Sequence, residues 1–243
     1  MTKINARLIA ATQPTVEIPV ATPEGVVAYC GRVSNPSNQD NPSFKKLFGY
    51  CMDNLHWSFF QMANAVVEIE APRDITRQFT RHGSLFTIEV DGSFKEERGF
   101  NQDQGGIQEF SQRYSDEIEF TEREFRRQDT KNRQNSIDDL NDEYATKLAY
   151  DAQGLVNEVD EYYKGLVKYG VAKECARVIL PEGLTMSRLY VNGTLRSWIH
   201  YLQVREGNGT QKEHVILANK IRKVLEPAFP TVFAMMKENK GES

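Results

Sequence analysis

Apolar residues recur at steps of three, four and seven along residues 137–166, which is the spacing of side chains on one face of a helix. The stripe consists of Ile137, Leu140, Tyr144, Leu148, Leu155, Val159, Tyr162 and Leu166. It predicts a helix about 30 residues long that begins at a cap formed by Ser136 and Asp139 and ends at Gly170. This helix is the clearest element of the chain.

Shorter patterns predict further helices. Thr22-Pro23-Glu24 is typical of an N-cap followed by a first-turn proline and acid, and it opens a helix that runs to Gly31. Other helices are expected at 43–55, 75–82, 171–180, 195–202 and 216–225. The last two carry regular apolar stripes, from Leu195 to Leu202 and from Ile216 to Leu225.

Strand patterns lie between these helices. Val66, Val67 and Ile69 indicate a buried strand, residues 85–90 alternate ahead of an Asp91-Gly92 hairpin turn, and residues 108–114 are a third candidate. Residues 184–192 read as extended, and the polar stretch 117–135 as an exposed loop or a frayed helix. The order of elements predicts one α+β domain over residues 1–243, with several helices packed on a small antiparallel sheet.

Composition narrows the class of protein. The chain has 243 residues, 40% of them hydrophobic, and a net charge of -4, which fits a globular protein and argues against a basic nucleic-acid-binding surface. No apolar run reaches the ~18 residues that cross a bilayer, and the apolar patch near the N-terminus is too short for a signal peptide. Three cysteines at wide spacing fit neither a disulfide framework nor a zinc site. We therefore expect a cytosolic (cytoplasmic) protein that binds neither membranes nor metal.

General site motifs such as GxGxxG, a Walker loop, GxSxG and HExxH are absent. Polar side chains nevertheless gather around 77–82, 109–114, 196–205 and 211–213. Arginines accompanied by hydroxyl and amide donors suit a planar, phosphorylated ligand. These residues alone indicate an anion or nucleotide site.

Each cluster also has a purely structural interpretation. Arg81 can interact with a helix dipole, and Arg196 with His200 can be a surface pair. Thr210 and Glu213 have the spacing of a capping box, while Phe110 and its neighbour Tyr114 can be core packing.

The order of five segments resembles the flavin-dependent thymidylate synthases. They are CGRVS at 30–34, LHWSFFQM from Leu55, RQFTRH followed by EFSQRY, ARVILP at 176–181, and TLRSWIHYLQVR…TQKEH at 194–214. The resemblance spans about residues 28–235. It implies a homotetramer of mixed α/β subunits with active sites at subunit interfaces. It also implies FAD as cofactor, NADPH as reductant, and methylenetetrahydrofolate as the one-carbon donor that methylates dUMP to dTMP.

The resemblance also implies roles for individual residues. For FAD they are His56, Ser58, Arg81, His82, Gly83, Glu109, Thr194, Arg196 and His200. For dUMP they are Gln78, Phe79, Thr80, Arg81, Glu109, Phe110, Ser111, Gln112, Arg113, Arg177 and Arg205. Arg205 would be catalytic, because the matching arginine lies against the uracil ring and favours its ionised form.

The residues also bear on the mechanism. No cysteine stands in the Pro-Cys-His context of the flavin-independent synthases, and Cys175 reads as buried packing. Ser111 has no histidine near it in sequence, so we expect it to donate a hydrogen bond rather than act as a nucleophile. Reduced flavin can supply the hydride that such a cysteine-free reaction needs.

Two positions depart from the family pattern. Gly83 stands where the signature has a second arginine, and an insertion with the predicted hairpin follows at about 84–107. Arg98 could return to the site, or Gly83 could simply permit the turn. Thr194 stands where the family often has asparagine, with Asn192 nearby.

Two other functions remain as alternatives to a thymidylate synthase. One is a non-catalytic relative that binds a nucleotide or flavin, which Gly83 would explain, and the other is an RNA-binding module, which the acidic pI of about 5.7 opposes.

Overall fold

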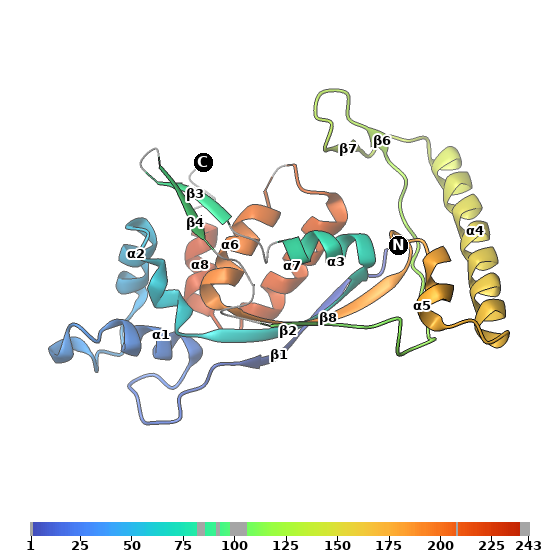
Figure 1. Ribbon diagram of the computed structural model, residues 1–243. Helices are drawn as coiled ribbons and strands as arrows, with labels where there is room; N and C mark the ends of the chain where they lie inside the picture. Colours follow the sequence, from blue (N-terminus) through green and yellow to red (C-terminus); the bar gives the residue numbers. More distant parts are fainter. Residues whose placement is uncertain (1, 82–85, 91–92, 98–105, 208, 239–243) are drawn as a thin grey trace.

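Strand β2 (Asn64–Pro72) is one of the two central strands of the sheet, since both of its edges are paired. It lies in an antiparallel sheet of order β1-β2-β8-β5, with β1 (Asn5–Ala11), β8 (Met186–Thr194) and β5 (Ile107–Glu109) (Figure 1). The computed structural model describes residues 2–81, 86–90, 93–97, 106–207 and 209–238. The strand predicted at 66–69 and the extended segment 184–192 are confirmed, and the fold is the predicted mixed α/β type.

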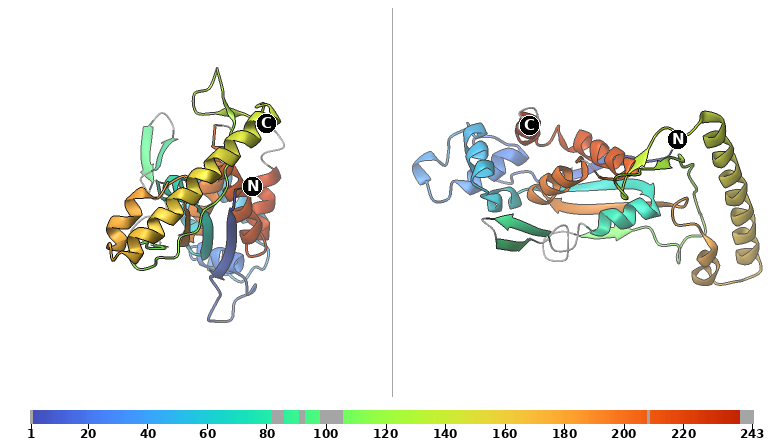
Figure 2. Two further views of the ribbon diagram at one scale, coloured as in Figure 1. Left: turned by 90° about the vertical axis from the view of Figure 1, so that its right-hand side faces the viewer. Right: turned by 90° about the horizontal axis from the view of Figure 1, so that it is seen from above.

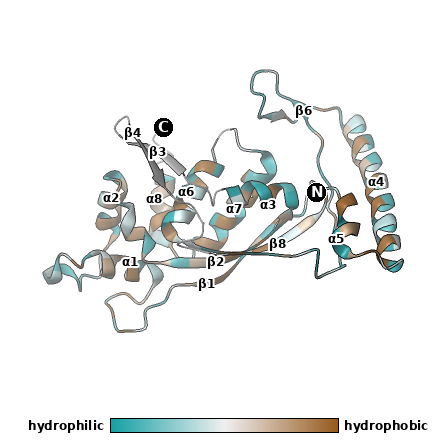
Figure 3. Cartoon of the chain, viewed as in Figure 1, coloured by the Kyte–Doolittle hydropathy of each residue, from teal (hydrophilic) through white to brown (hydrophobic). Residues whose placement is uncertain are grey.

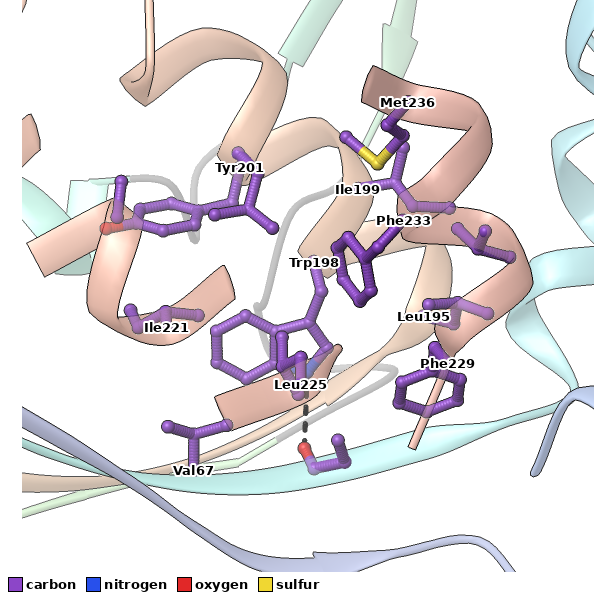
Figure 4. Close-up of a cluster of buried hydrophobic side chains, with 14 of the residues drawn as sticks. Val67, Leu195, Trp198, Ile199, Tyr201, Ile221, Leu225, Phe229, Phe233 and Met236 are labelled. Carbon is purple, nitrogen blue, oxygen red and sulfur yellow. Dashed lines mark hydrogen bonds between the residues drawn. The ribbon is translucent and has the colours of Figure 1, made fainter. Parts of the chain in front are cut away.

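Four helices cover one face of this sheet: α3 (Arg73–Thr80), α6 (Leu195–Arg205), α7 (Lys212–Leu225) and α8 (Pro230–Glu238) (Figures 1 and 2). Trp198 lies at the centre of the core between them and donates its indole N–H to the carbonyl oxygens of Ala65 and Gly193 (Figure 4). Around it pack Val67, Leu195, Ile199, Tyr201, Ile221, Leu225, Phe229, Phe233 and Met236. The apolar stripes predicted for α6 and α7 therefore face the core, except that Ile216 is exposed.

Strand β1 and helix α8 have no counterpart in the sequence predictions. Strand β1 is an edge strand whose pairing shifts register between Leu8 and Ala10, so its apolar residues do not alternate cleanly. Helix α8 begins at Pro230, which occupies the first helical position, where no N–H is needed.

Further helices lie at the two ends of the sheet. Near one end are α1 (Pro23–Gly31), η1 (Pro36–Asn38), α2 (Lys45–Asp53) and η2 (Trp57–Gln61). Near the other are α4 (Asp142–Lys168), α5 (Lys173–Ala176) and η4 (Arg177–Ile179). The Thr22 cap of α1 is confirmed, since its hydroxyl accepts the N–H of Gly25. Cys175, expected to be buried, is exposed on α5.

Two short hairpins complete the described structure. β3 (Phe86–Val90) pairs with β4 (Ser93–Glu97), with Val90 opposite Ser93, which agrees with the predicted hairpin. β6 (Arg127–Gln128), inside the stretch expected to be a loop or a frayed helix, pairs with β7 (Ser136–Ile137), which was expected to open the long helix. In the described part of the chain, no helix is both long and apolar enough to cross a membrane.

Helix α4 begins later than predicted. Its cap is Asn141, whose side-chain oxygen accepts the N–H groups of Glu143 and Tyr144, whereas Ser136 belongs to β7. It ends as predicted, just before Gly170, which has a positive φ of 84°. The helix stands apart from the sheet, with apolar residues recurring between hydrophilic turns (Figures 2 and 3).

The apolar stripe of α4 is largely uncovered. Leu155 is 64% exposed, and Tyr162 62%, while Tyr169 just beyond the helix is 90% exposed. These residues follow one another at seven-residue steps, the repeat by which two helices pack together. The stripe is therefore a surface, which we call the α4 seam, and not part of this chain's own core.

Residue Glu24 ties the first helix to the last. It is buried, and its carboxylate accepts the backbone N–H of Val232 in the first turn of α8 at 2.8 Å. Burial raises the pKa of Glu24, and the hydrogen bonds from Val232 and Thr231 oppose that rise. The side chain thus supplies an acceptor that the N-terminus of α8 needs.

Candidate functional site

Glu109 is the centre of a polar cluster between α3 and the sheet, which we call the Glu109 cluster: Arg73, Arg77, Glu109 and Ser187. The Ser187 hydroxyl donates to the Glu109 carboxylate at 2.9 Å. Guanidinium nitrogens of Arg73 and Arg77 lie 3.9 and 3.7 Å from its two oxygens. A carboxyl group so surrounded is held in position, with acceptor capacity left for a ligand.

The arginines of this cluster are themselves crowded. Burial lowers the pKa of Arg73, and the positive charges of Arg77 and Arg177 lower it further, against the opposing effect of Glu109. Arg177 is the first residue of η4, and no carboxylate pairs with it among the described residues. Excess positive charge in a half-buried place favours an anionic ligand. The motif search had not singled out Arg73 or Ser187, because only the fold brings them to Glu109.

The segment after Glu109 is a turn rather than the strand predicted at 108–114. Ser111 starts it: its carbonyl accepts the N–H of Tyr114, and its hydroxyl accepts the N–H of Arg113 at 3.3 Å. Phe110 and Tyr114 are both exposed, so the core-packing interpretation is wrong for them. Gln112 is buried, and its Nε2 has no hydrogen-bond partner among the described residues. Arg113 lies outside, where it pairs with Glu174 at 3.3 Å.

The C-terminal ends of α3 and α6 bring two arginines together. Arg81 ends α3 and is exposed, and Arg205 ends α6 and is half-buried. Burial lowers the pKa of Arg205, and the charge of Arg81 lowers it further, with Tyr201 opposing. Between them and the sheet, Phe79 is fully buried against Tyr201 at 5.0 Å between ring centroids, so its side chain provides packing.

Further along α3, Gln78 and Thr80 line an open pocket together with Arg77 and Arg81. The Thr80 hydroxyl donates to the carbonyl of Arg77, one turn earlier in the helix. This pocket therefore offers guanidinium and amide donors on one helix surface.

A second group lies where β8 passes into α6, and we call it the α6 cluster: His56, Ser58, Thr194, Arg196 and His200. Thr194 is buried and caps α6, since its hydroxyl accepts the N–H of Ser197 at 3.2 Å. Arg196 is half-buried, and burial lowers its pKa. The first turn of an 11-residue helix beside a guanidinium is a ready anion site.

His200 lies one turn after Arg196. Burial, followed by the charge of Arg196, lowers the pKa of His200 to about 4, although a hydrogen bond with Gln203 opposes the shift. Its ring meets that of Trp57 edge-on at 4.7 Å. His200 is therefore neutral at physiological pH. Arg196 and His200 are both half-buried, which is consistent with a partly exposed pair.

The other half of the α6 cluster is carried by η2. The exposed His56 donates its backbone N–H to the carbonyl of Cys51 at the end of α2, at 2.7 Å. Leu55 before it has a φ of 56°, in the left-handed region that a leucine seldom adopts. Gly31 lets α1 approach η2 closely, because a Cβ there would lie 2.1 Å from the Phe59 ring. The CGR part of the family-like segment 30–34 therefore supports the position of η2.

The two clusters are well separated within one chain. Glu109 pairs with Leu189 in β8, and Thr194 lies five residues further along that strand, about 16 Å at the rise of a β-strand. His82 and Gly83 lie outside the described residues. The described residues hold no group of three His, Cys, Asp or Glu side chains arranged to bind a metal ion.

Glu213 was interpreted from sequence as part of a capping box with Thr210, and this is wrong. Helix α7 is capped at Gln211, and Glu213 is buried in a bidentate ion pair with Arg126. The two residues are 87 positions apart in sequence, so no local pattern could have found the pair.

Known proteins match this chain over most of its length. The family model described as "Thymidylate synthase complementing protein" matches residues 17–231. A flavin-dependent thymidylate synthase of Synechocystis sp. is 42% identical over 236 residues, which cover 96% of this chain and 99% of that protein. A probable flavin-dependent thymidylate synthase of Paramecium bursaria Chlorella virus 1 is 39% identical over 231 residues, 94% of this chain and 97% of the relative.

Solved structures share the fold at lower identity. A UMP/dUMP methylase, PolB, of Streptomyces cacaoi bound with 5-Br dUMP is 19% identical at a TM-score of 0.71, covering 98% of this chain and 96% of that one. The same methylase bound with 5-Br UMP gives a TM-score of 0.75 at 19% identity, covering 98% and 95%.

Proposed function

The chain belongs to the family of flavin-dependent thymidylate synthases, and we propose that its two polar clusters divide the binding of dUMP and FAD between them. The protein is an enzyme that converts dUMP to dTMP by reductive methylation, and FAD is its cofactor. Bound FAD supplies the hydride for this reaction. The residues of the chain bind the substrate and the cofactor, orient them and polarise the reacting groups.

The observation that carries the dUMP assignment is the approach of Arg81 and Arg205 from the ends of two helices. Burial is the main cause of the lowered pKa of Arg205, and the like charge of Arg81 adds to it, so an anionic ligand would stabilise the pair. Uracil that loses its N3 proton is such an anion. Arg205 is the catalytic residue of this proposal, since a half-buried guanidinium stabilises that charge without reorganising.

The rest of the dUMP site follows from the Glu109 cluster and the turn after it. Gln78, Ser111 and the buried Nε2 of Gln112 offer neutral donors, and Arg113 with Arg177 offers positive charge for the phosphate. The rest of the proposed dUMP site is formed by backbone and side-chain atoms of Phe79, Thr80 and Phe110.

FAD fits the α6 cluster chemically. Its diphosphate needs oriented N–H groups and positive charge, which the first turn of α6 and Arg196 supply, and His56 and Ser58 are exposed on η2 beside them. The Thr194 hydroxyl caps the helix, so Thr194 acts by fixing that turn. The proposed FAD site also includes Arg81, Glu109 and His200. His82 and Gly83 belong to it as well, but they lie outside the described residues.

Methylenetetrahydrofolate as carbon donor and NADPH as reductant are proposed from family membership. A homotetramer with shared active sites is proposed because the two clusters of one chain lie about 16 Å apart along β8. The α4 seam supplies an uncovered apolar surface for such assembly. All three cysteines are free thiols, which supports a cytoplasmic location.

The test is tritium release from dUMP labelled at uracil C5, with purified protein, FAD, NADPH and methylenetetrahydrofolate, each omitted in turn. Methylation must displace the C5 hydrogen. Release that requires every component supports the proposal, including the cosubstrates. A protein that binds FAD and dUMP without release is a non-catalytic relative, and a protein that binds neither overturns both cluster assignments.

A further inference from the structure

A chain of hydrogen-bonded side chains runs from a buried ion pair to Gln78. Glu213 is 2% exposed and accepts two hydrogen bonds from Arg126, at 2.9 and 3.0 Å. Gln211 donates its Nε2 to Glu213 at 3.0 Å, and Gln78 donates its Nε2 to the Oε1 of Gln211 at 2.6 Å. The other amide atom of Gln78, Oε1, faces the Nδ1 of His214 at 3.3 Å.

Glu213, the first residue of this hydrogen-bonded series, is negatively charged. Burial alone would raise the pKa of Glu213, but the hydrogen bonds from Arg126 and Gln211 and the charge of Arg123, 3.7 Å away, lower it to about 2. Glu213 is therefore a carboxylate at any physiological pH. A carboxylate accepts hydrogen bonds and donates none.

That single fact fixes the orientation of every group after it. Gln211 must turn its nitrogen toward Glu213, so its oxygen faces Gln78. Gln78 must then turn its own nitrogen toward Gln211, which leaves its oxygen to accept from His214. His214 therefore carries a proton on Nδ1. Without the charge, a side-chain amide could lie either way round, since its two ends are nearly the same size.

We propose that Glu213 is a positioning residue for dUMP binding, because through Gln211 it presents the amide nitrogen of Gln78, and not its oxygen, to the substrate. The inference rests on the proposed role of Gln78 in the dUMP site. Gln78 lines the open pocket with Arg77 and Arg81. Its second Nε2 proton is the one not given to Gln211, and a uracil carbonyl oxygen is a matching acceptor.

A purely structural role for Glu213 is the competing explanation, because Arg126 also fastens the 120–137 segment to α7. Arg126 donates to Ser136 at 2.8 Å and to Glu124 at 2.8 Å. Glu124 is exposed and takes no part in the route to Gln78. Glu124→Gln is therefore a matched control that removes a carboxylate from the same arginine.

The experiment measures dUMP affinity of the FAD-loaded full-length protein by titration calorimetry. Glu213→Gln should weaken dUMP binding about ten- to a hundred-fold, the effect of losing one buried hydrogen bond and its orientation. Gln78→Leu should cause a similar loss, and the double variant should bind no more weakly than Gln78→Leu alone. FAD content should stay unchanged, as should dUMP affinity in Glu124→Gln.

Gln211→Met serves as the second variant, because it breaks the route while leaving the Glu213–Arg126 pair in place. It should reproduce the loss of dUMP affinity, again without adding to Gln78→Leu. In steady-state assays both single variants should raise the KM for dUMP and leave the KM for the folate unchanged, which a general loss of structure would not do.

Losses that add in the double variants would overturn the inference, as would an equal loss in Glu124→Gln. If Gln78→Leu binds dUMP weakly while Glu213→Gln and Gln211→Met both keep the wild-type affinity, the inference is also overturned. The proposed function would stand in that case. Wild-type affinity in Gln78→Leu would instead remove Gln78 from the dUMP site.

Discussion

Arg81 and Arg205 end two different helices on the same face of the sheet, and the charge of Arg81 adds to the larger effect of burial in lowering the pKa of Arg205. Two guanidinium groups that interact in this way repel each other. An anionic ligand bound beside them would offset that repulsion.

Replacement of Arg205 by Ala should therefore abolish turnover while FAD stays bound, because Arg205 acts on the uracil ring and not on the flavin. We expect kcat/KM for dUMP to fall at least about a hundred-fold. Tritium release and the flavin absorbance of the purified variant measure the two effects. Arg188→Ala, which removes an exposed arginine paired with Glu70, is the control. Wild-type turnover in Arg205→Ala would remove Arg205 from the mechanism.

Gly31→Ala should loosen the support of η2. The new Cβ would lie 2.1 Å from the Phe59 ring, an overlap that costs about 1–3 kcal/mol of unfolding free energy. Urea denaturation and FAD affinity should both show the loss, and Phe59→Leu should restore part of it. Gly154→Ala, in α4 with nothing within 4 Å, should instead stabilise by about 0.5–1 kcal/mol. Equal effects in the two variants would contradict this packing role of Gly31.

Leu155→Lys should weaken assembly, because it places a charge in the α4 seam. Sedimentation velocity should show smaller species at micromolar concentration, and activity should fall with them if active sites are shared. Asn157→Lys alters an exposed polar residue two positions away and should leave the mass unchanged. An unchanged mass in Leu155→Lys would show that the seam does not join subunits.

His200 should make stability depend on pH. The pKa of its ring is about 4 in the folded protein and 6.5 when unperturbed, so between these values the unfolded chain binds a proton that the folded chain does not. The contribution is intact above pH 6.5 and is lost as pH falls, by roughly 3 kcal/mol at pH 4. Denaturant titrations of His200→Asn should show a flatter profile over this window. An unchanged slope in His200→Asn would contradict this contribution.

Cys175→Ala should retain full activity, since the proposed reaction needs no cysteine nucleophile. Because Cys175 is exposed, thiol reagents should label it in the native protein without stopping turnover. A folded, FAD-loaded variant that released no tritium would overturn the cysteine-free mechanism.

Local signals predicted most of the helices and the central strands, because caps and periodicity act over a few residues. Thr22 capped α1 as expected, whereas Asn141 displaced Ser136 as the cap of α4. Of the strand predicted at 108–114, only residues 108–109 belong to β5, because Ser111 bonds to its own neighbours in a turn. Contacts between residues far apart in sequence were harder to predict. Arg126 and Glu213 pair only because the fold brings them together across 87 positions.

The sequence proposes which residues form the candidate site, but it does not predict their geometry. The family-like segments named Glu109 and His200, yet sequence gave no sign that a single chain keeps their clusters apart along β8. It also gave no sign that Ser187 would hold Glu109 in place, since 78 residues separate the two.

The hydrogen bond from Val232 to Glu24 spans 208 residues, and it sets an order of events during synthesis. A ribosome makes Glu24 first, and the N–H that its buried carboxylate accepts emerges 208 residues later. Until then, α1 and the η2 segment that packs on it lack their final neighbours. Because η2 carries Ser58, the FAD site that we propose gains its full support only after α8 has been made.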